Sequence, residues 1–321
     1  MNPDYVQNVR YKLQKRFRRL NAAGWEIFHY ALKQFWDFLY AQPVLVGIME
    51  DIERRCTSCQ VDADAIFGSE PLLPETELES VGIGYWLIKK CAESEEGNIE
   101  ITIGHRYRSS GTKHDDAIEL FRSYFVEPLY EYVDEQLDEQ RAMLALLHRY
   151  KQKCEWFQRG QLFDAWEADT SRGEKTLAFH LYEYLHDQGI DFHIEPSSAS
   201  GEVDLISAQE STDPLLADAK IFNPNRGCGK DYLATAVKQI YTYAVDYNQS
   251  FGYLVVYKTC PDDLRLALTN QAAATPFLVH NNKTIFLIVV DIFPHQKPAS
   301  KRGALKPVEI TEEDLVRVAE A

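Results

Sequence analysis

The second half of the chain alternates between strand-like and helix-like spacing of its apolar residues. Residues 215–222 and 251–259 are short apolar runs bounded by turn-forming residues, which is the pattern of buried strands. Residues 174–188 and 231–247 instead repeat apolar positions at helical intervals, which predicts two helices. Further strands are predicted at residues 192–195, 203–206 and 284–292. Strands that alternate with helices predict an α/β core in which a mixed sheet is flanked by helices.

The first half of the chain has a different pattern. Residues 5–41 and 115–157 carry apolar side chains at helical spacing, so we expect long helices there. Residues 60–78 are polar and contain prolines, which predicts a loop. Residues 81–89 and 99–103 surround a polar segment with a glycine and are predicted to form a small β-hairpin. This half is therefore expected to be mainly helical with a small strand insert.

The two patterns meet near residue 165. With 321 residues, 45% of them hydrophobic, the chain can bury a full core and is expected to form two domains. We predict a helical domain over residues 1–165, for sensing, oligomerisation or substrate positioning, and an α/β domain over residues 166–321.

The composition of the chain indicates which environment and which partners to expect. The longest strongly apolar segment, Thr284 to Ile292, has the length of a strand, so no membrane partner is expected. Six cysteines in a chain of this length indicate reduced thiols, and we expect a cytoplasmic protein. A net charge of −15 argues against general coating of DNA, because phosphate contacts rely on Lys and Arg.

Charged residues within the strand at 215–222 are the main chemical signal. Successive side chains of a strand point to opposite faces, so Asp218 and Lys220 are expected to share one face. Burying an unpaired charge is costly, and such a pair needs partners, a metal or a cleft. Asp204 lies on the preceding predicted strand and is expected beside Asp218 if the two strands form a hairpin. Two hard oxygen ligands of this kind suit Mg²⁺.

The order of these residues resembles the PD-(D/E)xK nuclease superfamily. A helix with Glu174 is followed by a strand with Asp204, a strand with Asp218-Ala219-Lys220 and a further helix. In that helix the segment from Gln239 to Tyr243 resembles the Gln-x-x-x-Tyr signature of the RecB-like branch. The resemblance covers roughly residues 170 to 295, and it implies a restriction-endonuclease-like fold.

The resemblance also implies roles for individual residues. Asp204, Asp218 and the backbone carbonyl of Ala219 would bind Mg²⁺, with Mn²⁺ as a substitute, and Lys220 would be catalytic. Glu174 would complete the acidic site, and Gln239 and Tyr243 would line the DNA side. The implied activity is hydrolysis of DNA, most simply by an endonuclease, and chains of this kind look like bacterial antiphage or restriction effectors. We also expect a homo-oligomer or a regulatory partner protein that restrains the activity.

Two details of the resemblance are open. The residue before Asp204 is Val203, where the superfamily usually has a proline. Glu183 lies on the same predicted helix as Glu174 and is an alternative for the acidic residue.

Residues 10–19 form a basic, amphipathic segment with six Lys or Arg side chains. Arg16 and Arg19 in this segment are candidate contacts to a nucleic-acid backbone. The alternative is that the basic segment packs against the acidic stretch from Glu127 to Glu139.

The sequence is also compatible with other functions. A nuclease fold without catalysis would serve as a module that binds nucleic acid or protein. Ribonuclease activity is a further alternative, either at the same site or at His148, which with Arg141 has a spacing seen in HEPN-type ribonucleases. Gly227 to Lys230 resembles a phosphate-binding loop only superficially, and the Cys56 and Cys59 pair has no second pair of zinc ligands nearby.

Overall fold

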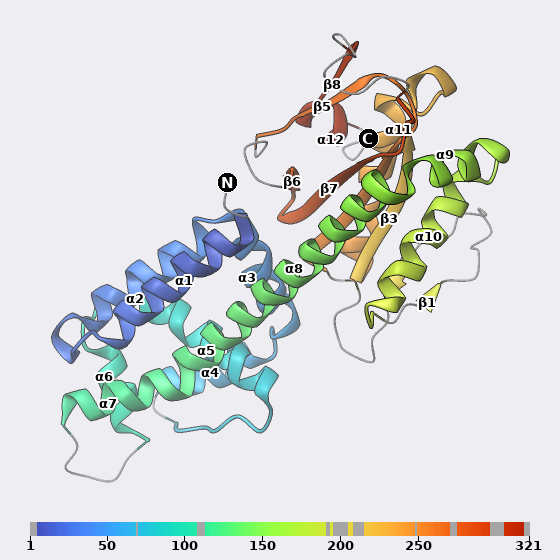
Figure 1. Ribbon diagram of the computed structural model, residues 1–321. Coiled ribbons are helices and arrows are strands. Elements are labelled where there is room, and N and C mark those ends of the chain that lie inside the picture. Colours follow the sequence, from blue (N-terminus) through green and yellow to red (C-terminus); the bar gives the residue numbers. More distant parts are fainter. Residues whose placement is uncertain are drawn as a thin grey trace. The chain divides into compact units, whose positions relative to one another are not determined.

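The computed structural model describes residues 5–68, 70–107, 113–190, 193–194, 205–207, 215–247, 249–269, 275–295 and 305–317. These residues form two compact units, which Figure 1 shows in blue to green and in green to red. The N-terminal unit spans Val6–Arg141, and the C-terminal unit comprises Tyr5 and the chain from Ala142 onward. The division therefore falls at Arg141, within a helix, and not at residue 165.

The N-terminal unit consists of helices joined by turns and loops, and its described residues include no strand. Its elements are α1 (Tyr5–Asn21), α2 (Trp25–Tyr40), α3 (Pro43–Arg55), α4 (Cys59–Gly68), α5 (Glu77–Glu93), α6 (Ile99–His105), α7 (His114–Phe121), a π-helical turn η1 (Arg122–Val126) and the first part of α8 (Glu127–Lys153). Its core is rich in aromatic rings, with Phe28 and Phe121 packed edge to face at 6.0 Å. In the parts of the chain that are described, no helix has the length and apolar character of a membrane span.

The β-hairpin predicted at residues 81–103 is wrong, because helices α5 and α6 occupy this segment. Every residue from Val81 to Ile88 is buried, and a helix that is enclosed on all sides shows the same continuous apolar run as a buried strand. The start of α5 does have a sequence signal: Thr76 and Glu79 form a capping box, in which each side chain accepts a hydrogen bond from the other residue's backbone. The loop predicted at residues 60–78 is also partly wrong, since α4 continues to Gly68.

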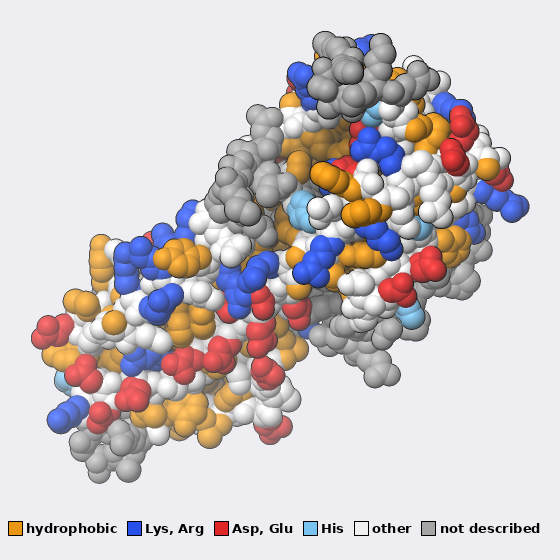
Figure 2. Space-filling model, viewed as in Figure 1, with side chains coloured by type: hydrophobic (Ala, Val, Ile, Leu, Met, Phe, Trp, Pro, Cys, Tyr) orange, Lys and Arg blue, Asp and Glu red, His pale blue; other side chains and the backbone are white. Residues whose placement is uncertain are grey.

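The basic segment at residues 10–19 lies within α1 and packs in part against the acidic stretch, as one alternative predicted. Arg10 forms a bidentate pair with Asp134 of α8, with nitrogen to oxygen distances of 2.9 and 2.8 Å. Nearby, the rings of Phe17 and Tyr130 stack with their centroids 3.6 Å apart. Lys12, Lys15, Arg18 and Arg19 remain exposed, and Figure 2 shows Lys and Arg side chains gathered over α1.

The C-terminal unit is built on a mixed sheet of six strands in the order β1-β2-β3-β4-β7-β6. The strands are β1 (His193–Ile194), β2 (Leu205–Ser207), β3 (Leu215–Phe222), β4 (Phe251–Lys258), β6 (Phe277–His280) and β7 (Lys283–Asp291). The two central pairings, β3 with β4 and β4 with β7, are parallel, and the others are antiparallel. The predicted α/β core, a mixed sheet flanked by helices, is confirmed.

Helix α11 (Lys230–Asp246) connects the parallel strands β3 and β4 and covers one face of the sheet. Its Leu233, Val237 and Ile240 pack in one buried cluster with side chains of the central strands, among them Phe222 and Leu254. Because β3 alternates, Asp218 and Lys220 lie on the same face as Phe222. The α11 face therefore carries both the main core cluster and the charged pair.

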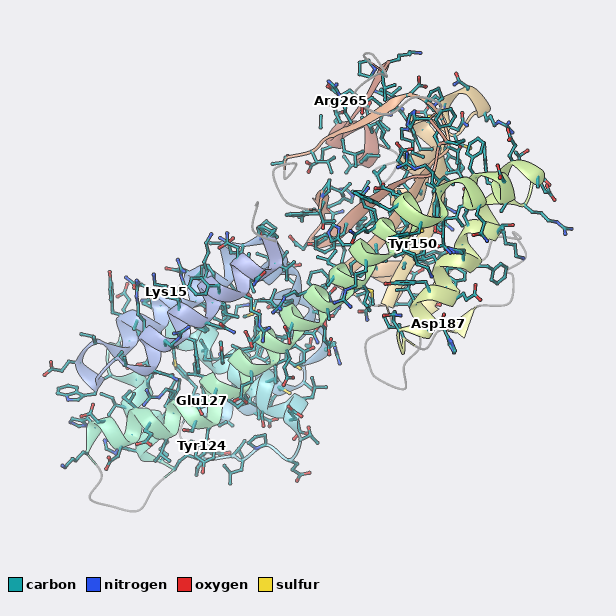
Figure 3. All side chains as sticks on the ribbon, viewed as in Figure 1. Lys15, Tyr124, Glu127, Tyr150, Asp187 and Arg265 are labelled. Carbon is teal, nitrogen blue, oxygen red and sulfur yellow. The ribbon has the colours of Figure 1, made fainter. Side chains whose placement is uncertain are left out.

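The opposite face of the sheet is joined to α8 and α10 (Gly173–Asp187) by buried hydroxyl groups, among them that of Tyr150. Figure 3 labels Tyr150 on α8. The Tyr150 hydroxyl of α8 contacts the Tyr257 hydroxyl of β4 and lies 2.8 Å from Nδ1 of His180 in α10. The Tyr257 hydroxyl also donates to the carbonyl of Leu177, at 3.1 Å. Burial lowers the pKa of His180, so this ring remains a neutral partner of Tyr150 at neutral pH.

Several small elements complete this unit. They are the π-helical turn η2 (Cys154–Gln158), α9 (Arg159–Ala168), the 3-10 turn η3 (Pro224–Arg226), β5 (Asp263–Ala267), β8 (Pro307–Thr311) and α12 (Glu312–Val316). Strands β5 and β8 form a separate parallel pair, which the apolar pattern of the sequence does not reveal.

Candidate active site

Strand β3 holds Asp218 and Lys220 in the position that strand alternation predicts. The Lys220 ammonium nitrogen lies 3.2 Å from Oδ2 of Asp218, and the two residues are only 6% and 4% exposed. The other carboxylate oxygen of Asp218 accepts a hydrogen bond from the backbone N–H of Ala219 at 2.7 Å. A charged pair at this depth is held by specific contacts, because little solvent is present to screen it.

Glu174, at the start of α10, is the second acid of the site. Its Oε1 lies 3.4 Å from the Lys220 nitrogen, and its Oε2 accepts a hydrogen bond from the backbone N–H of Ile221 at 3.1 Å. The carboxylate thus satisfies a backbone donor of β3 and the lysine together. Lys220 lies between two carboxylates that come from a helix and from its own strand.

The contact between Glu174 and β3 decides between Glu174 and Glu183, the two candidates that the sequence left open. Glu183 is exposed near the other end of α10, whereas Glu174 contacts β3 directly. A helix rises about 1.5 Å per residue, so these two positions on α10 are about 13 Å apart along its axis. Glu174 is therefore the acid of this site.

Tyr232 of α11 belongs to the site and was missed by sequence reasoning. Its hydroxyl donates a hydrogen bond to Oε2 of Glu174, the oxygen that also accepts from Ile221. Burial and the hydrogen bond to Glu174 raise the pKa of Tyr232 far above its ordinary value, so it remains a neutral donor. Burial and the nearby Glu174 carboxylate also raise the pKa of the Cys228 thiol.

The signature residues Gln239 and Tyr243 lie on α11 and contact each other. The amide nitrogen of Gln239 donates to the Tyr243 hydroxyl at 3.2 Å, and both side chains are partly buried. Positions that are 7 and 11 residues apart on a helix point in nearly the same direction, so Tyr232, Gln239 and Tyr243 share one side of α11. That side begins at the Glu174 contact and continues along the helix.

Asp204 lies outside the described residues. The strand that follows it is described: β2 pairs with β3 in antiparallel fashion, and Leu205 lies opposite Ala217. The predicted hairpin between these strands is therefore confirmed for residues 205–207 and 215–217.

The other candidates lie elsewhere or have other partners. Arg16 and Arg19 are in the N-terminal unit, on α1, and line a groove beside α2. His148 is hydrogen-bonded to Thr275, and Arg141 contacts Asp138 at 3.5 Å, so each has a partner of its own. All six cysteines are free thiols, and the zinc alternative for Cys56 and Cys59 gains no further ligand among the described residues.

The donor atoms of the site suit a hard cation. Asp218 and Glu174 supply carboxylate oxygens, and β3 supplies the carbonyl of Ala219. Among the residues described, no group of three His, Cys, Asp or Glu side chains is close enough to hold a metal. Mg²⁺ does not require such a cage, because it is commonly bound by one or two carboxylates, water and substrate phosphates. The residues present therefore fit Mg²⁺ better than a metal that needs nitrogen or sulfur ligands.

No protein-family model, curated protein or solved structure matches this chain.

Proposed function

We propose that the C-terminal unit is a PD-(D/E)xK nuclease that hydrolyses DNA phosphodiester bonds with Mg²⁺. The observation that carries the proposal is the position of the Lys220 ammonium on β3, 3.2 Å from Asp218 and 3.4 Å from Glu174. A buried lysine held between two acids is what a phosphodiesterase needs, because the acids attract a cation and the lysine faces the negative charge that grows on the phosphate.

Each residue has a proposed role. Asp218, the carbonyl of Ala219 and Asp204 would hold Mg²⁺, and when bound the ion would polarise the phosphodiester and lower the pKa of a water molecule. The pairing of Leu205 with Ala217 supports Asp204 as a ligand, since these residues adjoin Asp204 and Asp218 in the sequence. The Lys220 nitrogen would donate to a phosphate oxygen or orient the attacking water, and Glu174 would hold Lys220.

Tyr232 is proposed as a positioning residue, because it reaches the substrate only through Glu174. Tyr232→Phe removes one hydrogen bond to a carboxylate, so we expect kcat to fall about tenfold while KM is unchanged. The measurement is steady-state cleavage of a fluorescent oligonucleotide duplex. Tyr241→Phe is the matched control on the same helix. The Tyr241 hydroxyl accepts a hydrogen bond from the side chain of Asn281, which is not part of the site. A change of KM alone, or an equal effect of both variants, would contradict this role.

The experiment that tests the proposed function compares cleavage of supercoiled plasmid, linear duplex, single-stranded DNA and RNA with Mg²⁺, with Mn²⁺ and with EDTA. Wild type is expected to cut DNA only with a divalent ion, and Asp218→Asn is expected to lose about 10²-fold or more of that activity. Preferential cleavage of RNA at the same site would change the substrate but retain the mechanism. Activity that survives both EDTA and Asp218→Asn would overturn the proposal.

The second candidate is a binding module on the same fold. It is favoured by the fact that Lys220 neutralises part of the charge of the two acids. A folded protein that binds DNA equally well with and without Mg²⁺, and that cuts none of the substrates, would support it.

A further inference from the structure

The N-terminal unit contains a groove between α1 and α2 that the proposed nuclease does not use. Its volume is about 760 Å³, and it is lined only by residues 16–42 of these two helices and their ends. Sites for small ligands have volumes of roughly 300–1,000 Å³ and are mostly apolar, with a few placed polar groups. The groove meets both criteria, and the residues that line it determine which ligand chemistry it favours.

The walls of the groove are mainly aliphatic and aromatic. Leu20 and Ala31 line it with Phe35 and Phe38, and at its rim Ile27 and Tyr30 are 59% and 67% exposed. Exposed apolar side chains that lie together often mark a binding site, whereas single scattered ones are common on any protein surface. The groove therefore offers apolar contact to a ligand along most of its length.

Two guanidinium groups from one helix complete the groove. The Arg16 guanidinium stacks on the Phe38 ring, with its carbon 3.9 Å from the ring centroid, and donates to the carbonyl of Lys12 at 3.3 Å. Arg19 lies one helical turn further along α1 and is exposed. Neither arginine takes part in an ion pair within the described residues. Stacking fixes the plane of Arg16 and leaves other N–H groups free to bind a carboxylate, sulfonate or phosphate in a bidentate manner.

We propose that this groove binds a small organic anion with an apolar body, such as a fatty acid or an aryl sulfonate. Arg16 and Arg19 hold the anionic group, and the apolar body lies against Leu20, Ala31 and the rim. A nucleic-acid strand fits less well, because Asp37 also lines the groove and every further phosphate of a polyanion adds to the repulsion, whereas a small ligand places a single anionic group beside the two arginines. This proposal does not depend on the nuclease activity.

The test uses two fluorescent dyes of similar shape: 1-anilinonaphthalene-8-sulfonate, which is anionic, and N-phenyl-1-naphthylamine, which is neutral. The double variant Arg16→Ala and Arg19→Ala is expected to weaken binding of the sulfonate about tenfold or more, because charge-assisted hydrogen bonds are lost. Binding of the neutral dye should change less than about threefold, since the apolar walls remain. Dodecanoate should displace both dyes.

The matched control is the double variant Lys15→Ala and Arg18→Ala, which removes the same charge from residues of α1 outside this groove. It is expected to leave both dyes bound as in wild type. Ile27→Asp, at an exposed position of the rim, should weaken both dyes without unfolding the protein, which circular dichroism verifies. Equal weakening by both double variants would overturn the proposal. Displacement of the dyes by a dT15 oligonucleotide, but not by dodecanoate, would overturn it in favour of nucleic acid.

Discussion

Lys220→Met is expected to weaken the proposed nuclease activity and to lower the free energy of unfolding by about 3–5 kcal/mol, because removing one partner leaves a buried charge uncompensated. Both acids of the site lose their cation in this variant, and Asp218 is the more deeply buried of the two. We expect cleavage to fall about 10²-fold or more. Denaturant unfolding and the cleavage assay measure the two effects separately.

Mg²⁺ provides a test of this variant that does not require activity. A divalent ion that binds Asp218 replaces the missing ammonium, so Mg²⁺ should raise the melting temperature of Lys220→Met more than that of wild type. Lys230→Met is the control, because Lys230 forms an ion pair with Asp314 at the surface. This substitution should lower the free energy of unfolding by only about 0–1 kcal/mol. If Lys220→Met were as stable as the Lys230 variant, the buried pairs would contribute nothing to stability, and Asp218 and Glu174 would not need a cation.

Gly104→Ala is expected to destabilise the N-terminal unit by about 1–3 kcal/mol, although alanine favours helices. Gly104 lies near the end of α6, and a Cβ atom there would overlap the backbone carbonyl of Ala117 in α7. Backbone atoms cannot move aside as a flexible side chain can, so the two helices would have to separate. Thermal and denaturant unfolding of the purified variant measure the effect.

Gly160→Ala is the control for the glycine argument. Gly160 lies near the start of α9, and no atom lies within 4 Å of the position of its Cβ. At this position the substitution should raise the free energy of unfolding by about 0.4–1 kcal/mol, because it reduces the conformational freedom of the unfolded chain. If Gly104→Ala also stabilised, α6 and α7 would not be packed as closely as the structure shows.

The α/β half could be predicted from the sequence because each of its central strands has a clear local signal. Apolar runs at residues 215–222 and 251–259 correspond to β3 and β4, and helical spacing at 231–247 corresponds to α11. The helical half was less predictable. In α5 the residues from Val81 to Ile88 are all buried, and a completely enclosed segment shows no periodicity that separates a helix from a strand. Only the capping box at its start indicates the helix.

The candidate site could be predicted where its residues are close in sequence, and not where folding brings distant residues together. The alternation of β3 was sufficient to place Asp218 beside Lys220. The choice of Glu174 over Glu183 depends on where α10 begins relative to β3, which no local pattern specifies. Tyr232 has no such signal, since its role comes entirely from the contact between α11 and the start of α10.

One consequence of the cysteine distribution concerns site-specific labelling. All six cysteines lie in the described part of the chain, five of them are buried, and Cys228 is partly exposed. The natural sequence therefore provides a single accessible attachment point for a spectroscopic label, next to Glu174, without any engineered residue. Because the pKa of this thiol is raised, the labelling reaction is best carried out at alkaline pH, where the reactive thiolate is populated.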